Sequence, residues 1–429
     1  MAELKYASLP VYTPSEPSPR YSCEPACDEH TLQQTPRHSS LVPSGAYTQT
    51  SGKVTVTLFE QENGVDIPTY GRRADISGTI YLENHDRVSQ VVVKVEGKLD
   101  STISEGGSKS IITLSRSQTL WRKEMGNELP TLIPFSCELP SHFTYLGSER
   151  PLPPTYYLGH CGSPAFYIRS QYTISVRVTR ARHRNMEFLR NVDDVKIPFI
   201  YYPRTRAHRP IIPSPSFFST VKTSPEEWYQ VLYEMKMRTP SKVEPIHCHL
   251  FIPAGRVYGL SDKIPFHIQL NGPLDSLQKL LMPQPLDAPP PPLWSSKTHE
   301  KCPIHKKPKI RVYILRQYSI ETRGQKAWKN TTIGEGEIWE VPPAICDTQG
   351  ATRAVHLDWE GELKVQSSVT VGGFLAGNVC VKDFIVLSLE PPTIDSQTSP
   401  FFPLQITVPV RIVTDAYVEV TEYEPPPAA

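Results

Sequence analysis

The stretch "YGRRADISGTIYL", residues 70–82, has a counterpart in the second half of the chain, "YGLSDKIPFHIQL", residues 258–270. The two stretches align without a gap, and three aliphatic positions correspond: Ile76 with Ile264, Ile80 with Ile268, and Leu82 with Leu270. Aliphatic residues at alternate positions are typical of a half-buried β-strand, because successive side chains point to opposite faces. The shared Tyr-Gly opening favours a duplicated β-domain, and convergent strand patterning is the alternative.

Segments with the same alternation recur on both sides of these stretches. They are residues 54–59, 90–99 and 170–180 in the first half, and residues 310–321, 380–390 and 404–414 in the second. Short strands that follow one another without helices between them are typical of antiparallel sandwiches. The sequence therefore predicts an all-β fold of two tandem immunoglobulin-type β-sandwiches.

The tripeptide Ile-Pro-Phe recurs within the strand-like segments, beginning at Ile133, Ile197 and Ile264. Proline has no N–H group to donate to a β-ladder. We therefore expect the three prolines to lie on edge strands or at bulges.

The distribution of proline sets the expected domain boundaries. The 44 prolines in 429 residues are about twice the average share, and they gather where aliphatic residues are few. The length is sufficient for two domains that each bury a core. We expect a disordered Pro-rich tail at 1–51, the first sandwich at 52–203, a linker with a short helix at 204–245, the second sandwich at 246–415 with a Pro-rich loop at 271–309, and a tail at 416–429.

The linker carries a helix signal in "TSPEEWYQVLYEMKM", residues 223–237. Ser224 suits the N-cap, Pro225 suits the first turn, and two glutamates follow at the positive end of the helix dipole. An apolar stripe comes next: Trp228, Val231, Leu232 and Met235. We expect this helix to pack on a sandwich near the domain junction, and a membrane-surface helix is the alternative.

Charge and hydropathy exclude several classes of protein. Lys plus Arg number 45 against 44 Asp plus Glu, so no overall field attracts nucleic acid. The N-terminus lacks the apolar run of a signal peptide, and no run of about 18 apolar residues could span a membrane. Eight cysteines are scattered without close pairing, which is typical of free thiols in a reducing compartment. The sequence predicts a cytoplasmic protein that is not integral to the membrane. Peripheral attachment at the plasma membrane or endosomes is compatible with this prediction.

Motifs of catalysis and metal binding are missing from the sequence. It contains no G-x-S-x-G elbow, no phosphate loop and no H-E-x-x-H helix. The nearest metal-like groups are His247-Cys248-His249 and Cys302 with His305. In a strand, His247 and His249 share one face while Cys248 points away, so the triplet does not converge on one ion. We expect no enzyme activity, metal or cofactor, and a metal-dependent enzyme using the His247 region is the alternative.

Positive charge is concentrated between Arg177 and Arg209, where the sequence contains nine Lys or Arg residues and only three Asp or Glu residues. Arginine forks match phosphate oxygens, so this segment is a candidate for binding phosphorylated protein tails or anionic lipid headgroups. The candidate anion-binding residues are Arg180, Arg182, Arg184, Arg190 and Lys196. A solvated basic loop without a partner is the alternative.

Two segments match or approach the PPxY pattern that WW domains bind as an exposed polyproline peptide. One is Pro153-Pro154-Thr155-Tyr156, which lies between strand-like segments, so a buried structural anchor is the first interpretation and docking the second. The other is Leu9-Pro10-Val11-Tyr12 in the N-terminal tail, where leucine replaces the first proline. We expect the tail segment to be the better docking candidate, and an unremarkable piece of tail is the alternative.

The order of these features resembles that of arrestin-like proteins over about residues 52–415. "VTVTLF", "YGRRADISGTIYLEN", "LPPTYYLG" and "YTISVRVTR" are similar to the N-domain, and "HLFIPAGRVYGLSDKIPFHIQLNGP", "KIRVYILRQYSIE" and "LQITVPVRIV" to the C-domain. The Pro-rich N-terminal tail and the long loop in the second domain look most like the fungal alpha-arrestins. The C-terminal "TEYEPPPAA" places Tyr423 before its prolines, which is the reverse of the PPxY order.

This resemblance implies two arrestin-like sandwiches, no catalysis, and a trafficking adaptor. Proteins of the family recruit WW-containing HECT ubiquitin ligases to membrane transporters through PPxY-type motifs. We therefore expect an adaptor that links transporter or receptor cytoplasmic tails to such a ligase for ubiquitination and endocytosis. A cargo or signalling scaffold that works without a ligase is the alternative.

Overall fold

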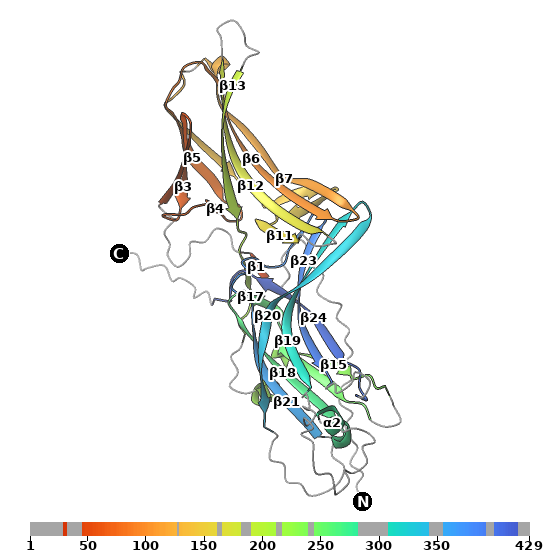
Figure 1. Cartoon of the computed structure of the whole chain (residues 1–429). Helices are drawn as coiled ribbons and strands as arrows, with labels where there is room; N and C mark the ends of the chain where they lie inside the picture. Colours follow the sequence, from red (N-terminus) through yellow and green to blue (C-terminus); the bar gives the residue numbers. More distant parts are fainter. Residues whose placement is uncertain are drawn as a thin grey trace, which may run out of the picture.

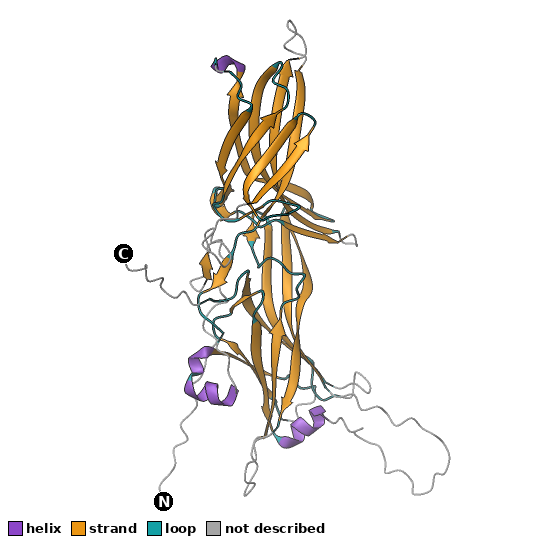
Figure 2. Ribbon diagram, turned by 90° about the vertical axis from the view of Figure 1, so that its left-hand side faces the viewer, coloured by secondary structure: helices purple, strands orange, loops and turns teal. Residues whose placement is uncertain are grey.

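The computed structural model describes residues 29–31, 45–126, 128–160, 165–181, 190–211, 217–238, 244–281, 308–342, 355–391 and 399–418. Figures 1 and 2 show two β-domains placed end to end along one long axis. We call residues 45–201 the N-domain and residues 228–413 the C-domain. The predicted all-β fold of tandem sandwiches is confirmed.

The N-domain is built from a four-stranded sheet and a larger sheet. The first has the order β2-β3-β5-β8, and the second has the order β4-β13-β12-β6-β7 with β11 beside β12. Its strands are β2 (Gly45–Ser51), β3 (Val54–Gln61), β4 (Thr69–Tyr70), β5 (Asp75–Leu82), β6 (Val88–Ile103), β7 (Gly107–Arg122), β8 (Leu132–Glu138), β11 (Tyr156–His160), β12 (Phe166–Ala181) and β13 (Arg190–Tyr201), with a separate hairpin of β9 (His142–Tyr145) and β10 (Ser148–Pro151).

The C-domain repeats this strand order in one continuous sheet. The sheet runs β15-β16-β18-β21-β20-β19-β23-β24-β17, with β22 beside β23. Its elements are β15 (Trp228–Glu234), β16 (His247–Pro253), β17 (Val257–Gly259), β18 (Lys263–Gly272), α2 (Leu274–Leu281), β19 (Lys309–Thr322), β20 (Gln325–Val341), β21 (Val355–Lys364), β22 (Leu375–Ala376), β23 (Val379–Glu390) and β24 (Leu404–Val413). Cutting the sheet between β21 and β20 yields the two sheets of the N-domain, strand for strand.

Strand β20 joins the two halves of the C-domain sheet because it bends from one to the other. Its residues up to Glu335 pair with β19, and those from Gly336 onward pair with β21. A Cβ atom on Gly334 would lie 2.3 Å from the carbonyl oxygen of Lys364, and one on Gly336 would lie 2.8 Å from that of Val312. Only glycine permits this close approach of backbones at the bend.

The stretches at residues 70–82 and 258–270 occupy equivalent places in the two domains. Tyr70 is the last residue of β4 and Tyr258 is the middle residue of β17, and each of these short strands pairs in parallel with β13 or β24, respectively. The corresponding aliphatics on β5 and β18 are all fully buried: Ile76, Ile264, Ile80, Ile268, Leu82 and Leu270. The common topology favours duplication over convergent strand patterning.

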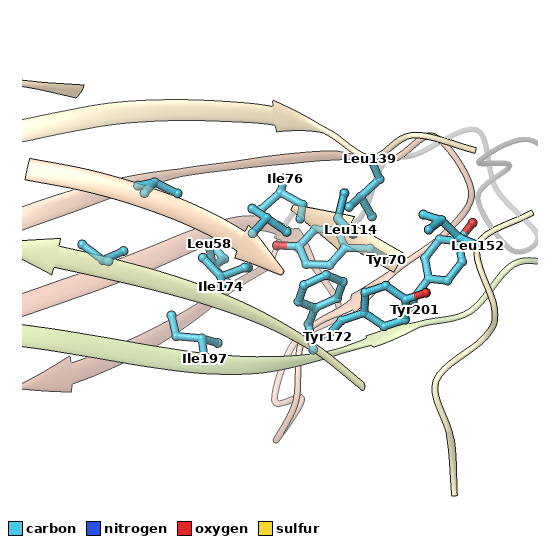
Figure 3. Packing of buried hydrophobic residues seen from close by; sticks show 14 of the residues in the cluster. Leu58, Tyr70, Ile76, Leu114, Leu139, Leu152, Tyr172, Ile174, Ile197 and Tyr201 are labelled. Atoms are coloured by element: carbon cyan, nitrogen blue, oxygen red, sulfur yellow. The ribbon is translucent and has the colours of Figure 1, made fainter. Parts of the chain in front are cut away.

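The aliphatic residues at alternate strand positions form the core of each sandwich. Tyr172, Ile174, Val176 and Val178 point inward from β12. Figure 3 shows Leu58, Ile174 and Ile197 in the middle of the N-domain, and an aromatic group of Tyr70, Tyr172 and Tyr201 toward one end. Each fully buried aliphatic side chain contributes about 1.5–3 kcal/mol relative to exposure.

All three Ile-Pro-Phe prolines lie where the strand has an open side. Pro134 is in β8, which is at the edge of its sheet. Pro198 lies in β13 outside the short stretch that β4 covers. Pro265 lies in β18 beyond the last residue that pairs with β16, which is His267. The missing N–H groups therefore cost no hydrogen bond in the ladders.

The prediction of a helix after Ser224 is wrong. Pro225–Glu227 form a single 3₁₀ turn, and Trp228–Glu234 form β15, which pairs with β16 along its whole length. Strand β15 is aromatic and β-branched in part, a composition that suits a strand, and the edge of β16 offers it a complete ladder. The linker helix is instead α1, Phe217–Thr223.

Two predicted boundaries are also corrected. Strand β2 begins at Gly45 rather than near residue 52, and Glu29–Thr31 form a short strand β1 that pairs with β14, Thr205–Ala207. The side chains of β2 are mostly exposed, so no hydrophobic alternation marked it. The C-domain begins with β15, at residue 228 rather than 246.

The repeated Tyr-Gly pair supplies a matched test of the C-domain packing. A Cβ on Gly259 would lie 2.6 Å from the backbone nitrogen of Ala416, whereas one on Gly71 would meet nothing within 4 Å. We expect Gly259→Ala to destabilise the protein by about 1–3 kcal/mol and Gly71→Ala to leave stability nearly unchanged. Thermal unfolding of both variants measures this, and equal effects at the two positions would refute the packing described here.

Candidate functional site

The two domains share one hydrophobic cluster at their junction. Buried residues of the C-domain strands β19, β22 and β23 belong to the same cluster as the N-domain core: Tyr318, Ile320, Ala376, Val379 and Val381. Figure 1 shows β23 and the β19–β20 hairpin reaching the N-domain, where the hairpin meets the tips of β6 and β7. The junction is therefore an apolar interface rather than a flexible hinge.

The Pro153–Tyr156 segment is part of this junction. Pro153 and Pro154 are buried, and the carbonyl oxygen of Pro153 accepts a hydrogen bond of 2.6 Å from the Tyr172 hydroxyl. The N–H of Thr155 donates to the carbonyl oxygen of Tyr201 at 2.9 Å, and the N–H of Tyr201 donates to Thr155 Oγ1 at 2.8 Å. Both faces of the segment are thus engaged within the N-domain.

Tyr156 connects this segment to the C-domain through side-chain contacts. Its ring lies 5.4 Å from that of Phe374 and 6.3 Å from that of Tyr318, centroid to centroid, and its hydroxyl donates to the Tyr318 hydroxyl at 3.0 Å. Burial raises the pKa of Tyr156, and the neighbouring Tyr318 raises it further. A WW domain requires an exposed tyrosine in a free polyproline peptide, so the structural interpretation of this segment fits its position and the docking interpretation does not.

A buried ion pair lies next to Tyr156. Arg316 on β19 is 1% exposed, and Asp383, directly opposite on β23, is fully buried. The guanidinium donates from Nε to Asp383 Oδ1 at 2.7 Å, from a second nitrogen to Oδ2 at 3.0 Å, and from the third to the carbonyl oxygen of Val371 at 2.9 Å. Burial opposes the charge of Arg316, but the Asp383 carboxylate and its hydrogen bonds raise the guanidinium pKa overall.

Sequence reasoning missed this pair, although a signal was present. Arg316 occupies an inward position of the alternating strand "IRVYILRQYSIE", and Asp383 occupies an inward position of "CVKDFIVLSLE". A charged residue on the buried parity of a strand needs a partner. Two such residues of opposite sign, one on each of two candidate neighbouring strands, predict a buried ion pair.

A second polar contact ties the linker to the end of the C-domain. Arg204 Nε lies 3.1 Å from Asp415 Oδ2, and the N–H of Thr205 donates to Thr414 Oγ1 at 2.8 Å. Burial would raise the pKa of Asp415, but hydrogen bonds from Arg204 and Thr414 lower it below its usual value. The exits of both domains, after β13 and after β24, are therefore held side by side.

The basic segment is not assembled as predicted. Arg180 is engaged internally, because its Nε lies 2.9 Å from Asp193 Oδ2 and its Nη1 donates to the carbonyl oxygens of Asn84 and Asp86. Lys196 is exposed and 3.6 Å from Asp194. It lies six residues from Arg190 along β13, roughly 20 Å away.

The remaining members of the basic segment are only partly described. Arg182 and Arg184 lie outside the described residues, and of Arg190 only the backbone, paired with Ala181, is described. β12 and β13 run toward the end of the N-domain farthest from the C-domain (Figure 1). The five candidate residues therefore do not form one cluster, and Arg180 and Lys196 are removed from the site.

The His247 region does not gather metal ligands. Cys248 is buried in the C-domain core, where burial raises its pKa to about 12, and His249 Nδ1 lies 2.6 Å from Gln230 Nε2. Among the residues that the structure describes, no group of three His, Cys, Asp or Glu side chains is placed to hold a metal ion. Cys302 and His305 lie outside this part of the chain, as does Leu9-Pro10-Val11-Tyr12.

Comparisons with known proteins give no assignment. No protein-family model matches the chain, and no curated protein matches it significantly. Neither helix in the described part of the chain is long and apolar enough to cross a membrane.

The position of Tyr156 predicts a stability difference between two adjacent tyrosines. Tyr157 is 69% exposed, whereas Tyr156 packs between the domains. We expect Tyr156→Ala to lower the free energy of unfolding by about 3 kcal/mol, at the low end of the range for truncating a buried aromatic side chain because this ring is partly buried, and Tyr157→Ala to lower it much less. Chemical denaturation measures both, and a Tyr156→Ala protein as stable as the parent would show that this ring is not an anchor.

The buried ion pair predicts a double-mutant pattern. Asp383→Leu leaves the Arg316 charge unpaired in the interior and should cost about 3–5 kcal/mol, while the double variant Arg316→Met/Asp383→Leu should recover much of that loss. Glu335→Leu is the matched control, because Glu335 forms an exposed cross-strand pair with Arg311 that is worth at most about 1 kcal/mol. Additive losses in the double variant would argue against a coupled pair.

Proposed function

We propose that this protein is a non-enzymatic, arrestin-like trafficking adaptor of the cytoplasm. It links the cytoplasmic tails of membrane transporters or receptors to a WW-containing HECT ubiquitin ligase, so that the cargo is ubiquitinated and internalised. The observation that carries the proposal is the pair of sandwiches with one strand order, joined by a shared core. The resemblance in the order of sequence features to arrestin-like proteins supports the same class.

The junction supports a scaffold role on physical grounds. Rigid sheets position binding loops, and the loops of sandwiches carry recognition. Here the two domains are fixed by apolar packing, by the Tyr156–Tyr318 hydrogen bond and by the Arg204–Asp415 pair. Loops on the two domains are thereby held at a set separation, so that they can bind one cargo tail as a single surface.

The docking segment proposed for the ligase is Leu9-Pro10-Val11-Tyr12. Pro153–Tyr156 matches the PPxY pattern more closely, but its prolines are buried and its tyrosine is bonded to Tyr318. Leu9 precedes β1, which is paired with β14, by 20 residues. If a segment of that length behaved as a flexible chain, a bound ligase would sample a radius of roughly 22–27 Å.

A pull-down with an isolated WW domain tests the docking proposal. We expect Tyr12→Ala to lose binding while its melting temperature stays that of the parent, because the tail segment lies before the first N-domain strand. Tyr12→Phe is the control for loss of the hydroxyl alone.

Absence of WW binding by the parent protein would instead favour a cargo or signalling scaffold that works without a ligase, and retention of binding by Tyr12→Ala would show that the WW domain docks on another segment. Binding that is lost in Tyr156→Ala but not in Tyr12→Ala, with Tyr156→Ala still folded, would show that the two segments were assigned the wrong way round.

The basic turn between β12 and β13 is proposed as a contact for anionic headgroups or phosphorylated tails, now restricted to Arg182, Arg184 and Arg190. Neutralising Arg182 and Arg184 to Gln should weaken cosedimentation with anionic vesicles, and the binding should fall steeply with salt. Arg177→Gln with Lys196→Gln removes the same charge from the stem of the hairpin as a control. Equal losses in both variants, or no vesicle binding by the parent, would remove this contact from the proposal.

A further inference from the structure

Strand β15 is an open edge of the C-domain sheet. It stands at the end of the strand order and pairs, in the described part of the chain, with β16 alone. Leu232 and Tyr233 are 55% and 47% exposed, and no proline, glycine or lysine interrupts Trp228–Glu234. An edge strand with apolar side chains and no such interruption is a site for pairing with another strand.

The other described edge strands of comparable length carry features that oppose pairing. Strands β8, β13 and β24 contain prolines, β7 and β2 are bulged, and the open half of β20 contains lysines: Pro134, Pro198, Pro409, Lys326 and Lys329. Prolines, bulges and lysines protect an edge against association with a second sheet. Because β15 has none of these features, it is the edge best suited to pairing.

The free hydrogen-bonding groups of this edge belong to even-numbered residues. Directly after the strand, the N–H of Met235 donates to the carbonyl oxygen of Ile246 at 2.9 Å, on the side of β16. Alternate residues of an antiparallel ladder bond to opposite sides. The N–H and C=O groups of even-numbered residues such as Gln230 and Leu232 therefore point to the open side.

Opposite charges flank the open stretch. Glu226 comes before β15 and Lys236 comes after it, and both side chains are exposed. The open side ends at Lys236, whose carbonyl oxygen accepts a hydrogen bond of 2.8 Å from the N–H of Phe402. When two such stretches run antiparallel, the acidic start of each meets the basic end of the other. The edge is thus complementary in charge to itself.

We propose that β15 pairs antiparallel with β15 of a second copy of this chain, with Val231 facing its own counterpart on the two-fold axis. In this register Gln230 lies opposite Leu232 of the second copy, and Trp228 lies opposite Glu234 of the second copy. Even-numbered residues face even-numbered ones, as the free backbone groups require. The contact is isologous, so it closes as a dimer.

The side chains suit the same register. Tyr229 packs against the C-domain core from its face of β15, and it lies opposite Tyr233 of the second copy, which makes an aromatic cross-strand pair. Continuing the register places Glu226 opposite Lys236 of the second copy. Aromatic and opposite-charge pairs stabilise a sheet, and no like charges meet in this register. The dimer does not depend on the adaptor proposal.

Sedimentation equilibrium of the full chain over a range of protein concentrations tests the dimer. We expect a reversible monomer–dimer equilibrium for the parent, and Leu232→Lys should raise its dissociation constant by at least about tenfold. Circular dichroism should show that this variant stays folded, because Leu232 is half exposed. Trp328→Lys is the matched control: it adds the same charge in place of a 65% exposed side chain on β20 and should dimerise as the parent does.

A charge exchange tests the antiparallel direction. Glu226→Lys sets two lysines opposite each other at both ends of the ladder and should weaken the dimer by about tenfold. The double variant Glu226→Lys/Lys236→Glu restores opposite charges and should recover most of the affinity. Failure of the double variant to recover would contradict the register.

Oxidative cross-linking tests the two-fold axis. In a non-hydrogen-bonded antiparallel pair the Cα atoms are about 4.5 Å apart, which a disulfide can span, so Val231→Cys should cross-link two copies above the level of the parent. Tyr233→Cys is the control, because its counterpart would lie about 13 Å away. The proposal is overturned if the parent is monomeric at every concentration, which leaves the edge to an extended peptide of another protein, or if Leu232→Lys dimerises as the parent does.

Discussion

The hydrophobic core shared by the two sandwiches constrains the rest of the structure. C-domain residues such as Tyr318 and Val379 are buried among N-domain side chains, so the domains cannot separate without exposing apolar surface to water. The Pro153–Tyr156 segment crosses at this point, and its tyrosine bonds to the opposite domain. The close match of that segment to a docking motif thus reflects what the junction needs there: two rigid residues and an aromatic ring.

The Arg316–Asp383 pair gives this junction a defined geometry. Burying two charges costs free energy that their attraction repays only when the geometry is good, and here all three guanidinium nitrogens have acceptors. The pair links β19 and β23 at one register and holds the Val371 carbonyl in place.

The sequence was sufficient for the fold where side chains decide it. Alternating aliphatics such as Ile76 and Ile80 have one buried face whatever their partners are, and their repeat at Ile264 and Ile268 carried the domain pattern. The sequence was insufficient where the structure depends on which strands or side chains pair with one another. Strand β2 is exposed and held by backbone hydrogen bonds, and β15 takes its conformation from the edge of β16. Arg180 finds acceptors at Asn84 and Asp86, nearly a hundred residues earlier, and no local pattern reveals such contacts.

The central claim is that the two sandwiches behave as one cooperative unit, and differential scanning calorimetry of the full chain tests it most directly. The account predicts a single transition whose calorimetric enthalpy equals its van't Hoff enthalpy, as for one two-state unit. Two resolved transitions, or a calorimetric enthalpy about twice the van't Hoff value, would show that the domains unfold independently and that the shared core does not couple them.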